Sequence, residues 1–201
     1  MNTWSSQSIL TNGIRVHYHR TGGRDKPVLL MTHGFTDNGL CWSRTAHELE
    51  DDYDILMLDT GATWDGYFCD FDRNFAIGQA DDLSHRAYDV LWRATEAGIA
   101  AARPGTTCRD LFQTMQSVIA EMDSSGGDVG RLGHGLGMQL TEWPSHAAFD
   151  NTVIQENMVL TLEPSLSYGD GRIMVHEEDI VIRSSGAELL TTRAAPELPV
   201  I

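Results

Sequence analysis

The chain has 201 residues, of which 41% are hydrophobic, so it can form one core of ordinary size. Acidic side chains outnumber basic ones 29 to 14 and give a formal charge of −15, which argues against a nucleic-acid or anionic-membrane partner. Three cysteines without a C-x-x-C pair indicate neither a disulfide framework nor a zinc knuckle.

The amino terminus, Met1 to Leu10, has neither the basic segment nor the apolar segment of a signal peptide. No uninterrupted apolar run approaches the roughly 18 residues of a membrane helix. We therefore expect a soluble, cytoplasmic protein with no membrane partner. The excess of acidic residues has two explanations that composition cannot separate, namely solubility and carboxylates gathered around cations.

The first 58 residues predict a β-β-α-β run. A strand with Ile14, Val16 and Tyr18 follows an Asn12-Gly13 turn, and an apolar strand over residues 27–31 leads into His33-Gly34-Phe35. A short helix is expected over residues 40–49 and a buried strand over residues 53–58. This part of the chain therefore has an α/β pattern.

From Asp59 onward the pattern changes. Two short strands flank an Asp65-Gly66 turn, which is typical of a hairpin. A helix is expected after Ser84, with its end at Pro104-Gly105. A second helix is expected from Thr107, where the Thr-x-x-Asp spacing predicts a capping box.

Residues 132–182 are rich in glycine and in β-forming residues, and they predict a hairpin around Gly169-Asp170-Gly171. The segment after Arg193 is expected to be surface coil. No internal repeat or low-complexity linker divides the chain.

Hairpin geometry predicts two pairs of acidic side chains on shared faces. A two-residue turn at Asp65-Gly66 places Asp59 across from Asp72, with Asp70 as its diagonal neighbour on the same face. In the second hairpin, pairing of Tyr168 with Arg172 sets a register in which Glu163 lies opposite Glu177. Facing like charges need a cation or a proton to compensate them.

One histidine has a setting that suits metal binding. His134 lies between glycines that allow the backbone to approach closely, so its ring is free to reach inward. Four carboxylates and one imidazole suit Mn²⁺, Fe²⁺, Co²⁺ or Zn²⁺, as a pair of ions roughly 3.5 to 4 Å apart. His176 precedes Glu177 on the same strand and is expected to point to the opposite face, so it is not counted as a ligand.

Five sequence blocks carry a resemblance to a known family, the pita-bread metallopeptidases, which include methionine aminopeptidase, aminopeptidase P, prolidase and creatinase. The blocks occur in the family's order. They are Leu58-Asp59-Thr60-Gly61-Ala62, the run of residues 65–73, Gly133-His134-Gly135-Leu136-Gly137, Thr161-Leu162-Glu163-Pro164 and His176-Glu177-Glu178-Asp179-Ile180.

The resemblance implies a fold, an activity and a role for each ligand. Residues 59–193 would form an α+β pita-bread sheet with its helices, and residues 194–201 a tail. Asp59 would hold one of two divalent metal ions (Mn, Co, Fe or Zn), Asp70 and Glu177 would bridge both, and His134 with Glu163 would complete the second. Glu163 is also expected to accept the proton of an activated water. The implied activity is cleavage of a C–N bond in a small peptide or amide substrate, as in Xaa-Pro peptidases.

Two positions depart from the family's pattern. Many of its peptidases have histidines where this chain has Gly130 and Thr141, and those histidines help to bind and protonate peptides. Their absence puts removal of a residue before proline in doubt. His146 lies close enough in sequence to serve as a substitute catalytic histidine.

Residues 10–58 resemble instead the opening of an α/β-hydrolase, whose oxyanion loop would correspond to His33-Gly34-Phe35. No serine has the G-x-S-x-G setting of a nucleophile elbow, so His33 is expected to be structural. We therefore hypothesise a fusion of two partial folds, with the first half of the pita-bread fold replaced. An uncovered sheet face in such a fusion would favour a homodimer.

Two other functions remain open. The chain could be an inactive or partly folded metal-binding fragment, because the first half of the fold is unrecognisable. It could also be a serine esterase, a function that would be indicated by hydrolysis that survives chelation of metals.

Overall fold

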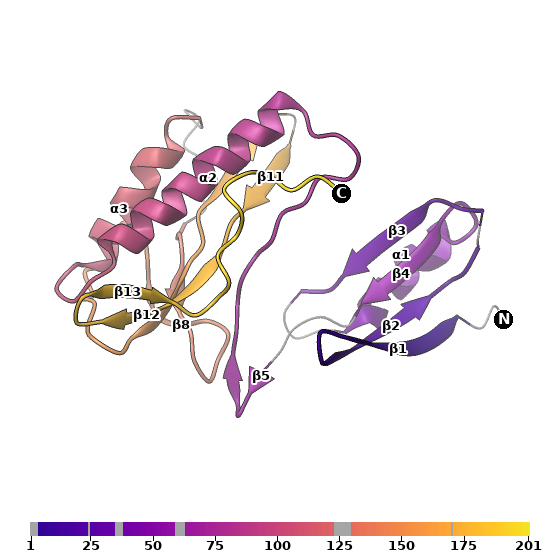
Figure 1. Ribbon diagram of the computed structural model, residues 1–201, viewed down its shortest axis with the longest axis horizontal. Helices are drawn as coiled ribbons and strands as arrows, with labels where there is room; N and C mark the ends of the chain where they lie inside the picture. The colour runs from indigo at the N-terminus through magenta and orange to yellow at the C-terminus, as the bar shows by residue number, and fades with distance from the viewer. Residues whose placement is uncertain (1–3, 24, 35–37, 59–62, 123–129, 170) are drawn as a thin grey trace. The chain divides into compact units, whose positions relative to one another are not determined.

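The computed structural model describes residues 4–23, 25–34, 38–58, 63–122, 130–169 and 171–201 (Figure 1). The chain divides into two compact units, Met1–Ala62 and Thr63–Ile201. The junction falls close to Asp59, where the sequence pattern changes. That the two units derive from two different folds stays a prediction.

The first unit is a four-stranded sheet with one short helix. Its strands lie in the order β1-β2-β4-β3, with β1 and β2 antiparallel and β3 parallel to β4. The predicted β-β-α-β order is confirmed from residue 14 onward, and a further strand, β1, precedes it. The elements are β1 (Ser5–Thr11), β2 (Ile14–Arg20), β3 (Val28–Thr32), the 3₁₀ helix η1 (Gly39–Trp42), α1 (Ser43–Leu49) and β4 (Asp54–Leu58).

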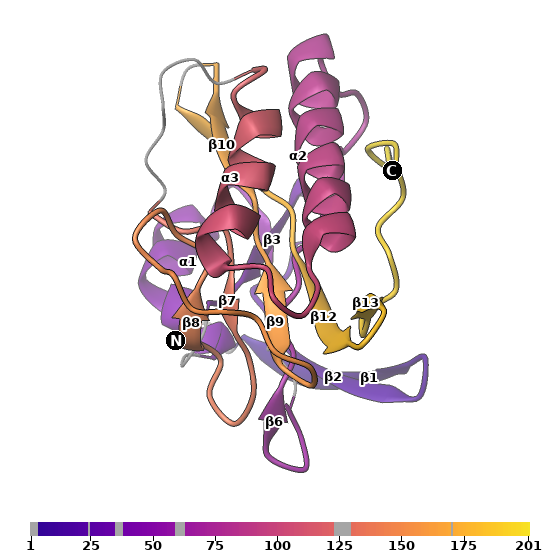
Figure 2. The ribbon, with the colours of Figure 1, turned by 90° about the vertical axis from the view of Figure 1, so that its left-hand side faces the viewer.

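The second unit is built on a five-stranded sheet in the order β13-β12-β9-β7-β8. Figures 1 and 2 show α2 and α3 side by side on one face of this sheet. The elements are β5 (Thr63–Trp64), β6 (Tyr67–Phe68), α2 (Asp82–Ala101), α3 (Cys108–Ile119), β7 (His134–Gly135), β8 (Glu142–Ser145), β9 (Val159–Leu162), β10 (Ser165–Tyr168), β11 (Arg172–Val175), β12 (Glu178–Arg183) and β13 (Gly186–Leu189).

The core of the second unit lies between the helices and the sheet. Leu91 of α2 and Met115 of α3 are fully buried, as are Leu160 of β9 and Ile180 of β12. The apolar stripes of the two helices therefore pack on the strands that lead to the predicted ligands. None of the helices in the described ranges is long and apolar enough to cross a membrane.

Both helices begin at side-chain caps. The Thr107 hydroxyl accepts from the Asp110 amide, and the Asp110 carboxylate accepts from the Thr107 amide, so the predicted capping box is confirmed. The prediction that α2 begins after Ser84 is wrong by one turn. The Asp81 carboxylate accepts from the Ser84 amide at 2.7 Å and caps the helix three residues earlier.

The long hairpin has the predicted register. Tyr168 pairs with Arg172 and Ser165 with Val175, and the same register continues beyond a gap, where Leu162 pairs with Glu178. Both glutamates lie in that gap, because Glu163 directly follows β9 and Glu177 directly precedes β12. They therefore sit across from each other where the ladder is interrupted.

The shorter hairpin is confirmed only near its turn. Asp65 and Gly66 have φ angles of 49° and 85°, as in a two-residue turn, and the paired residues end at Phe68. Asp70 lies beyond the ladder. Asp59 lies outside the described residues, so its predicted position across from Asp72 stays a prediction.

The carboxyl-terminal segment is more ordered than expected. Leu198 is buried, the Ala76 amide donates to Pro199 O, and the Ile201 amide donates to Ala76 O, each hydrogen bond being 2.8 Å long. The predicted surface coil after Arg193 is confirmed in that residues 194–199 form no helix or strand and all of them except Leu198 are partly or fully exposed, but the segment is anchored by its pairing with the chain that precedes α2.

Candidate metal centre

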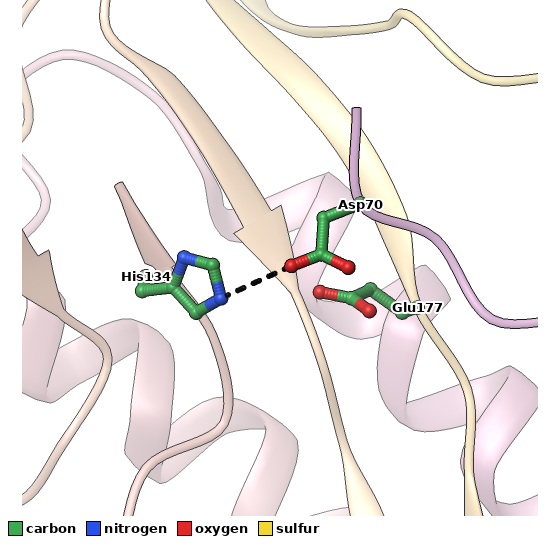
Figure 3. A group of neighbouring side chains, drawn as sticks. All are labelled: Asp70, His134 and Glu177. Atoms are coloured by element: carbon green, nitrogen blue, oxygen red, sulfur yellow. Dashed lines mark ion pairs between the residues drawn. The ribbon is translucent and has the colours of Figure 1, made fainter. Parts of the chain in front are cut away.

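Three of the predicted ligands converge on one point. One ligand atom from each of Asp70, His134 and Glu177 lies within 4.8 Å of the other two, and Figure 3 shows the three side chains pointing toward one another. His134 Nε2 lies 3.6 Å from Asp70 Oδ2 and 3.9 Å from Glu163 Oε2. The structure thus brings four of the predicted ligands together, and Asp59 lies outside the described residues.

The orientation of His134 leaves one ring nitrogen available to a metal. Nδ1–H donates to the carbonyl oxygen of Gly135 at 2.8 Å, since a carbonyl can only accept. Nε2 therefore carries the lone pair, and this atom faces the carboxylates. Burial lowers the pKa of His134, which favours the neutral form that binds metals.

Two glycines allow this histidine to reach its place. Gly133 has a φ of 135°, and a Cβ added there would lie 2.2 Å from the carbonyl oxygen of Thr161. A Cβ on Gly135 would lie 2.5 Å from the carbonyl oxygen of Trp143. The expected close approach of the backbone is confirmed, because only glycine fits between β7 and its neighbours β8 and β9.

The carboxylates resist ionisation when they stand together. Burial, followed by the charges of Glu163 and Asp70, raises the pKa of Glu177 to about 10. Burial and the charge of Asp72 raise the pKa of Asp70 to about 6. Burial also raises the pKa of Glu163, whose side chain is 31% exposed.

One buried atom of the group has no hydrogen-bond partner in the part of the chain that the structure describes. Glu177 Oε1 is buried and has no hydrogen-bond partner among the described residues. A buried polar atom without a partner is costly, and a cation would compensate both this atom and the neighbouring charges. The donor set of carboxylate oxygens and one imidazole therefore fits divalent cations of the Mn²⁺ to Zn²⁺ series.

The two other histidines near the site have different surroundings. His176 donates to or accepts from the Thr95 hydroxyl at 3.0 Å on the helix side of the sheet, which confirms that it points away from Glu177. His146 is fully buried, and its ring nitrogens have no partner among the described residues. Burial lowers the pKa of His146 to about 4. Its predicted catalytic role stays a prediction that nothing in these surroundings supports.

Residues adjacent to the ligands form a support that the sequence analysis missed. Arg73 donates to the carbonyl oxygen of Glu177 and to the carboxylate of Glu178, both at 2.9 Å. Glu178 is fully buried and also accepts from Arg193 at 3.0 Å. The Arg73 guanidinium therefore holds the backbone that carries Glu177. Arg73 follows the predicted ligand Asp70 by three residues, and Glu178 directly follows Glu177. This closeness in sequence is the signal that could have identified them.

The chain matches the model of metallopeptidase family M24 over residues 12–184. It belongs to this family. It is 31% identical over 141 residues to an Xaa-Pro dipeptidase of Pyrococcus furiosus, a match that covers 69% of this chain and 40% of the relative. A putative dipeptidase of Bacillus subtilis is 33% identical over 139 residues, which cover 69% of this chain and 38% of that protein.

Solved structures agree with the family assignment. An X-Pro aminopeptidase from Thermotoga maritima has a TM-score of 0.65 and 27% identity, and the match covers 75% of this chain and 44% of that one. The prolidase from Pyrococcus furiosus has a TM-score of 0.63 and 29% identity, with 72% and 44% covered. The fold is therefore α+β and pita-bread-like. The chain spans about two fifths of the length of these curated relatives.

The comparisons do not support the second resemblance. The family model begins at residue 12, so it includes most of the segment that resembles the opening of an α/β-hydrolase. The β-β-α-β order of that segment is confirmed, but its origin in a different fold, and the fusion hypothesis with it, has no support from known proteins.

Proposed function

We propose that the chain is a dimetal-dependent hydrolase that cleaves the C–N bond of a small peptide-like substrate, as an Xaa-Pro dipeptidase does. The observation that carries this proposal is the convergence of Asp70, His134 and Glu177, with Glu163 at its margin. Family M24 membership and the dipeptidase names of several relatives support the reaction class.

Each predicted ligand would bind one or both of the two cations. Asp70 and Glu177 face each other and would be shared between two ions, and His134 Nε2 and Glu163 would bind the second. Asp59, outside the described residues, would bind the first. When bound, a pair of such cations polarises the scissile carbonyl and lowers the pKa of a water molecule.

The proton transfer is assigned to Glu163. Its side chain is 31% exposed, so solvent and substrate can reach its carboxylate, which can accept a proton from a bound water. Glu177 is almost wholly buried and suits a ligand better than a proton carrier.

The test combines metal content with hydrolysis of an Xaa-Pro dipeptide by the full chain. After reconstitution with Mn²⁺ or Co²⁺, elemental analysis should find close to two ions per chain, and dipeptide hydrolysis should stop on chelation. Glu177→Gln should lose both metal and activity. Glu188→Gln, which removes an exposed carboxylate of β13, is the matched control and should keep both.

Two results would redirect the proposal. A metal content well below one ion per chain in the wild-type protein would overturn it. Full metal content without hydrolysis of any dipeptide would favour the inactive metal-binding alternative.

The esterase alternative rests on the β-β-α-β order of the first unit and on His33-Gly34, and it has its own test. Hydrolysis of an activated ester that survives chelation and is blocked by a serine-directed reagent would support it. We expect no such activity, because no serine in the chain has the setting of a nucleophile elbow.

A further inference from the structure

The three converging ligands come from segments that are far apart in the sequence (Figure 3). Asp70 belongs to the segment that follows β6, His134 begins β7, and Glu177 directly precedes β12. A metal site tolerates only small errors in the positions of its ligands. The fold must therefore fix the main chain of each segment relative to the others.

A pair of buried polar residues lies one step along the ladder from the two glutamates. Thr161 of β9 pairs with Asp179 of β12. Side chains two residues apart on a strand share a face, so Thr161 lies on the face of Glu163 and Asp179 on the face of Glu177. Thr161 is fully buried, and Asp179 is 3% exposed. The sheet thus places two buried hydrogen-bonding groups on its metal-binding face.

The approach of β7 to β9 puts His134 directly across from Thr161. The Glu163 amide donates to Leu132 O at 3.0 Å, and the same antiparallel register continues to the pairing of Gly135 with β9. His134 lies between these two contacts. Its partner in that register is Thr161.

The Thr161 hydroxyl bonds to two of the ligands. Its oxygen accepts from the buried His134 amide at 3.2 Å. It is also a hydrogen-bond partner of the Glu177 carboxyl. A hydroxyl has a single proton, so while its oxygen accepts from His134 it can donate that proton to the ionised Glu177 carboxylate. One side chain therefore connects two ligands that belong to different strands.

Asp179 makes the corresponding contact to Asp70. Its Oδ2 accepts from the Asp70 amide at 3.1 Å. The paired residues of the short hairpin end at Phe68, and Asp70 lies outside the strands of the described residues. The Asp179 side chain therefore binds a stretch of main chain that is not held by strand pairing.

We propose that Thr161 and Asp179 are positioning residues of the metal centre, which fix the main chain of His134 and of Asp70 respectively. This role rests on the metal binding in the proposed function. Each residue acts through the ligand to which it bonds. Replacement of residues that orient metal ligands typically weakens metal binding by roughly 10- to 100-fold. The two strands β9 and β12 thus carry these supports next to the glutamate ligands.

Titration of the full, metal-depleted chain with Mn²⁺, followed by calorimetry, tests Thr161 without using activity. Thr161→Val keeps the size of the side chain but removes the hydroxyl, and it should weaken Mn²⁺ binding roughly 10- to 100-fold. Thr161→Ser keeps the hydroxyl and should restore most of the affinity. Wild-type affinity in a folded Thr161→Val chain, or no recovery with serine, would overturn the role of Thr161.

Thr95→Val is the matched control. Thr95 is also fully buried in the second unit, but its hydroxyl donates to Leu91 O on the helix side of the sheet. The same change at this position should leave Mn²⁺ affinity unaltered. An equal loss in Thr95→Val would show that any buried hydroxyl matters and would contradict a specific role for Thr161.

Two variants of Asp179 separate its hydrogen bond from its charge. Asp179→Leu and Asp179→Asn both remove the negative charge, but only asparagine keeps an oxygen that can accept from the Asp70 amide. Leucine should weaken Mn²⁺ binding roughly 10- to 100-fold, and asparagine should recover most of this loss. Equal losses in the two folded variants would assign the effect to the charge and contradict a positioning role.

Two further measurements distinguish positioning from a general loss of stability. The visible absorption of bound Co²⁺ reports the arrangement of its ligands, so at saturating Co²⁺ it should change in Thr161→Val and not in Thr95→Val. In the metal-free chain, exchange of the His134 amide should be about fivefold faster in Thr161→Val, as expected for the loss of one hydrogen bond. The Asp70 amide should respond in the same way to Asp179→Leu.

The exchange measurement also separates this inference from the proposed function. If the wild-type chain binds no metal, the proposed function fails, and faster exchange of the two amides still supports the fixing of these segments by Thr161 and Asp179. If the wild-type chain binds two ions and neither exchange nor affinity changes in the variants, the proposed function stands and the positioning role is wrong.

Discussion

The two units of the chain differ in how much apolar material they bury. In the first, Ala46, Ile55 and Met57 form the buried cluster, while Val28 and Leu30 of β3 remain more than half exposed at 69% and 54%. In the second, both helices and the sheet contribute to one continuous core. The metal ligands described here all belong to the second unit. A precise site thus lies where packing is dense, since dense packing limits side-chain movement.

The largest expected effects come from truncating one core residue in each unit. Leu160→Ala should cost the second unit about 2 to 5 kcal/mol, because Leu160 is fully buried beside the metal strands. Ile55→Ala should unfold the first unit and lower the metal content toward one ion per chain, because Asp59, the proposed ligand of the first ion, is the next residue after β4. Thermal unfolding followed with metal content measures both. Loss of both ions in Ile55→Ala would mean that the second unit does not fold independently of the first.

Backbone strain at Gly133 gives the next largest effect. Gly133→Ala should destabilise the second unit by roughly 3 kcal/mol or more, because it combines an unfavourable φ with overlap against Thr161 O. Urea denaturation measures the loss. Gly13→Ala in the first unit is the control, since Gly13 also has a positive φ of 77° but no atom lies within 4 Å of an added Cβ. Equal losses for the two variants would show that the overlap is relieved by movement.

Metal binding should stabilise the second unit in a pH-dependent way. The pKa of Glu177 in the folded chain is raised from its ordinary 4.5 to about 10, so without a cation stability falls as pH rises between these values. A cation that replaces the proton removes this loss. The rise in melting temperature caused by Mn²⁺ should therefore be larger at pH 8.5 than at pH 5.5. At a free Mn²⁺ concentration a hundredfold above its Kd, binding adds about 2.7 kcal/mol to the free energy of unfolding.

Glu177→Gln is the control for that measurement. It should abolish both the stabilisation by Mn²⁺ and most of its pH dependence. A shift in melting temperature that is the same at both pH values would show that Glu177 does not exchange a proton for the cation.

The smallest expected effect concerns the start of α3. Thr107→Ala removes the hydroxyl that accepts from the Asp110 amide and should cost about 1 kcal/mol. Chemical denaturation of the second unit measures it. Thr107→Ser retains the hydroxyl and should restore most of the loss, so an equally unstable serine variant would argue against the cap as the cause.

Much of the fold could be predicted because local chemistry determines it. The Asp65-Gly66 turn, the Thr107 capping box and the register around Tyr168 and Arg172 each depend on residues close in sequence. The start of α2 was misplaced because Asp81 and Ser84 are both good capping residues, and only the structure shows which one is used. The order of the final segment depends on its pairing with Ala76, far away in sequence, which no local pattern indicates.

The candidate site also has residues that local sequence identifies and residues that only the folded structure identifies. Asp70, His134, Glu163 and Glu177 could be predicted from motif and register, and the structure brings them together. Arg73 could not be assigned, because its role depends on which backbone carbonyl and which buried carboxylate lie within its reach after folding. Such a balance of hydrogen bonds is a property of the whole packed unit.

The shared register of the long hairpin limits which changes in chain length its ancestors could have accepted. Extra residues inserted at the turn around Gly169 and Gly171 only lengthen the loop and leave every paired residue in place. One residue added between Pro164 and Tyr168, or between Arg172 and His176, would turn Glu163 or Glu177 toward the helices, since successive side chains on a strand face opposite sides. Length variation in this hairpin should therefore be confined to its tip, or occur in compensating pairs on its two arms.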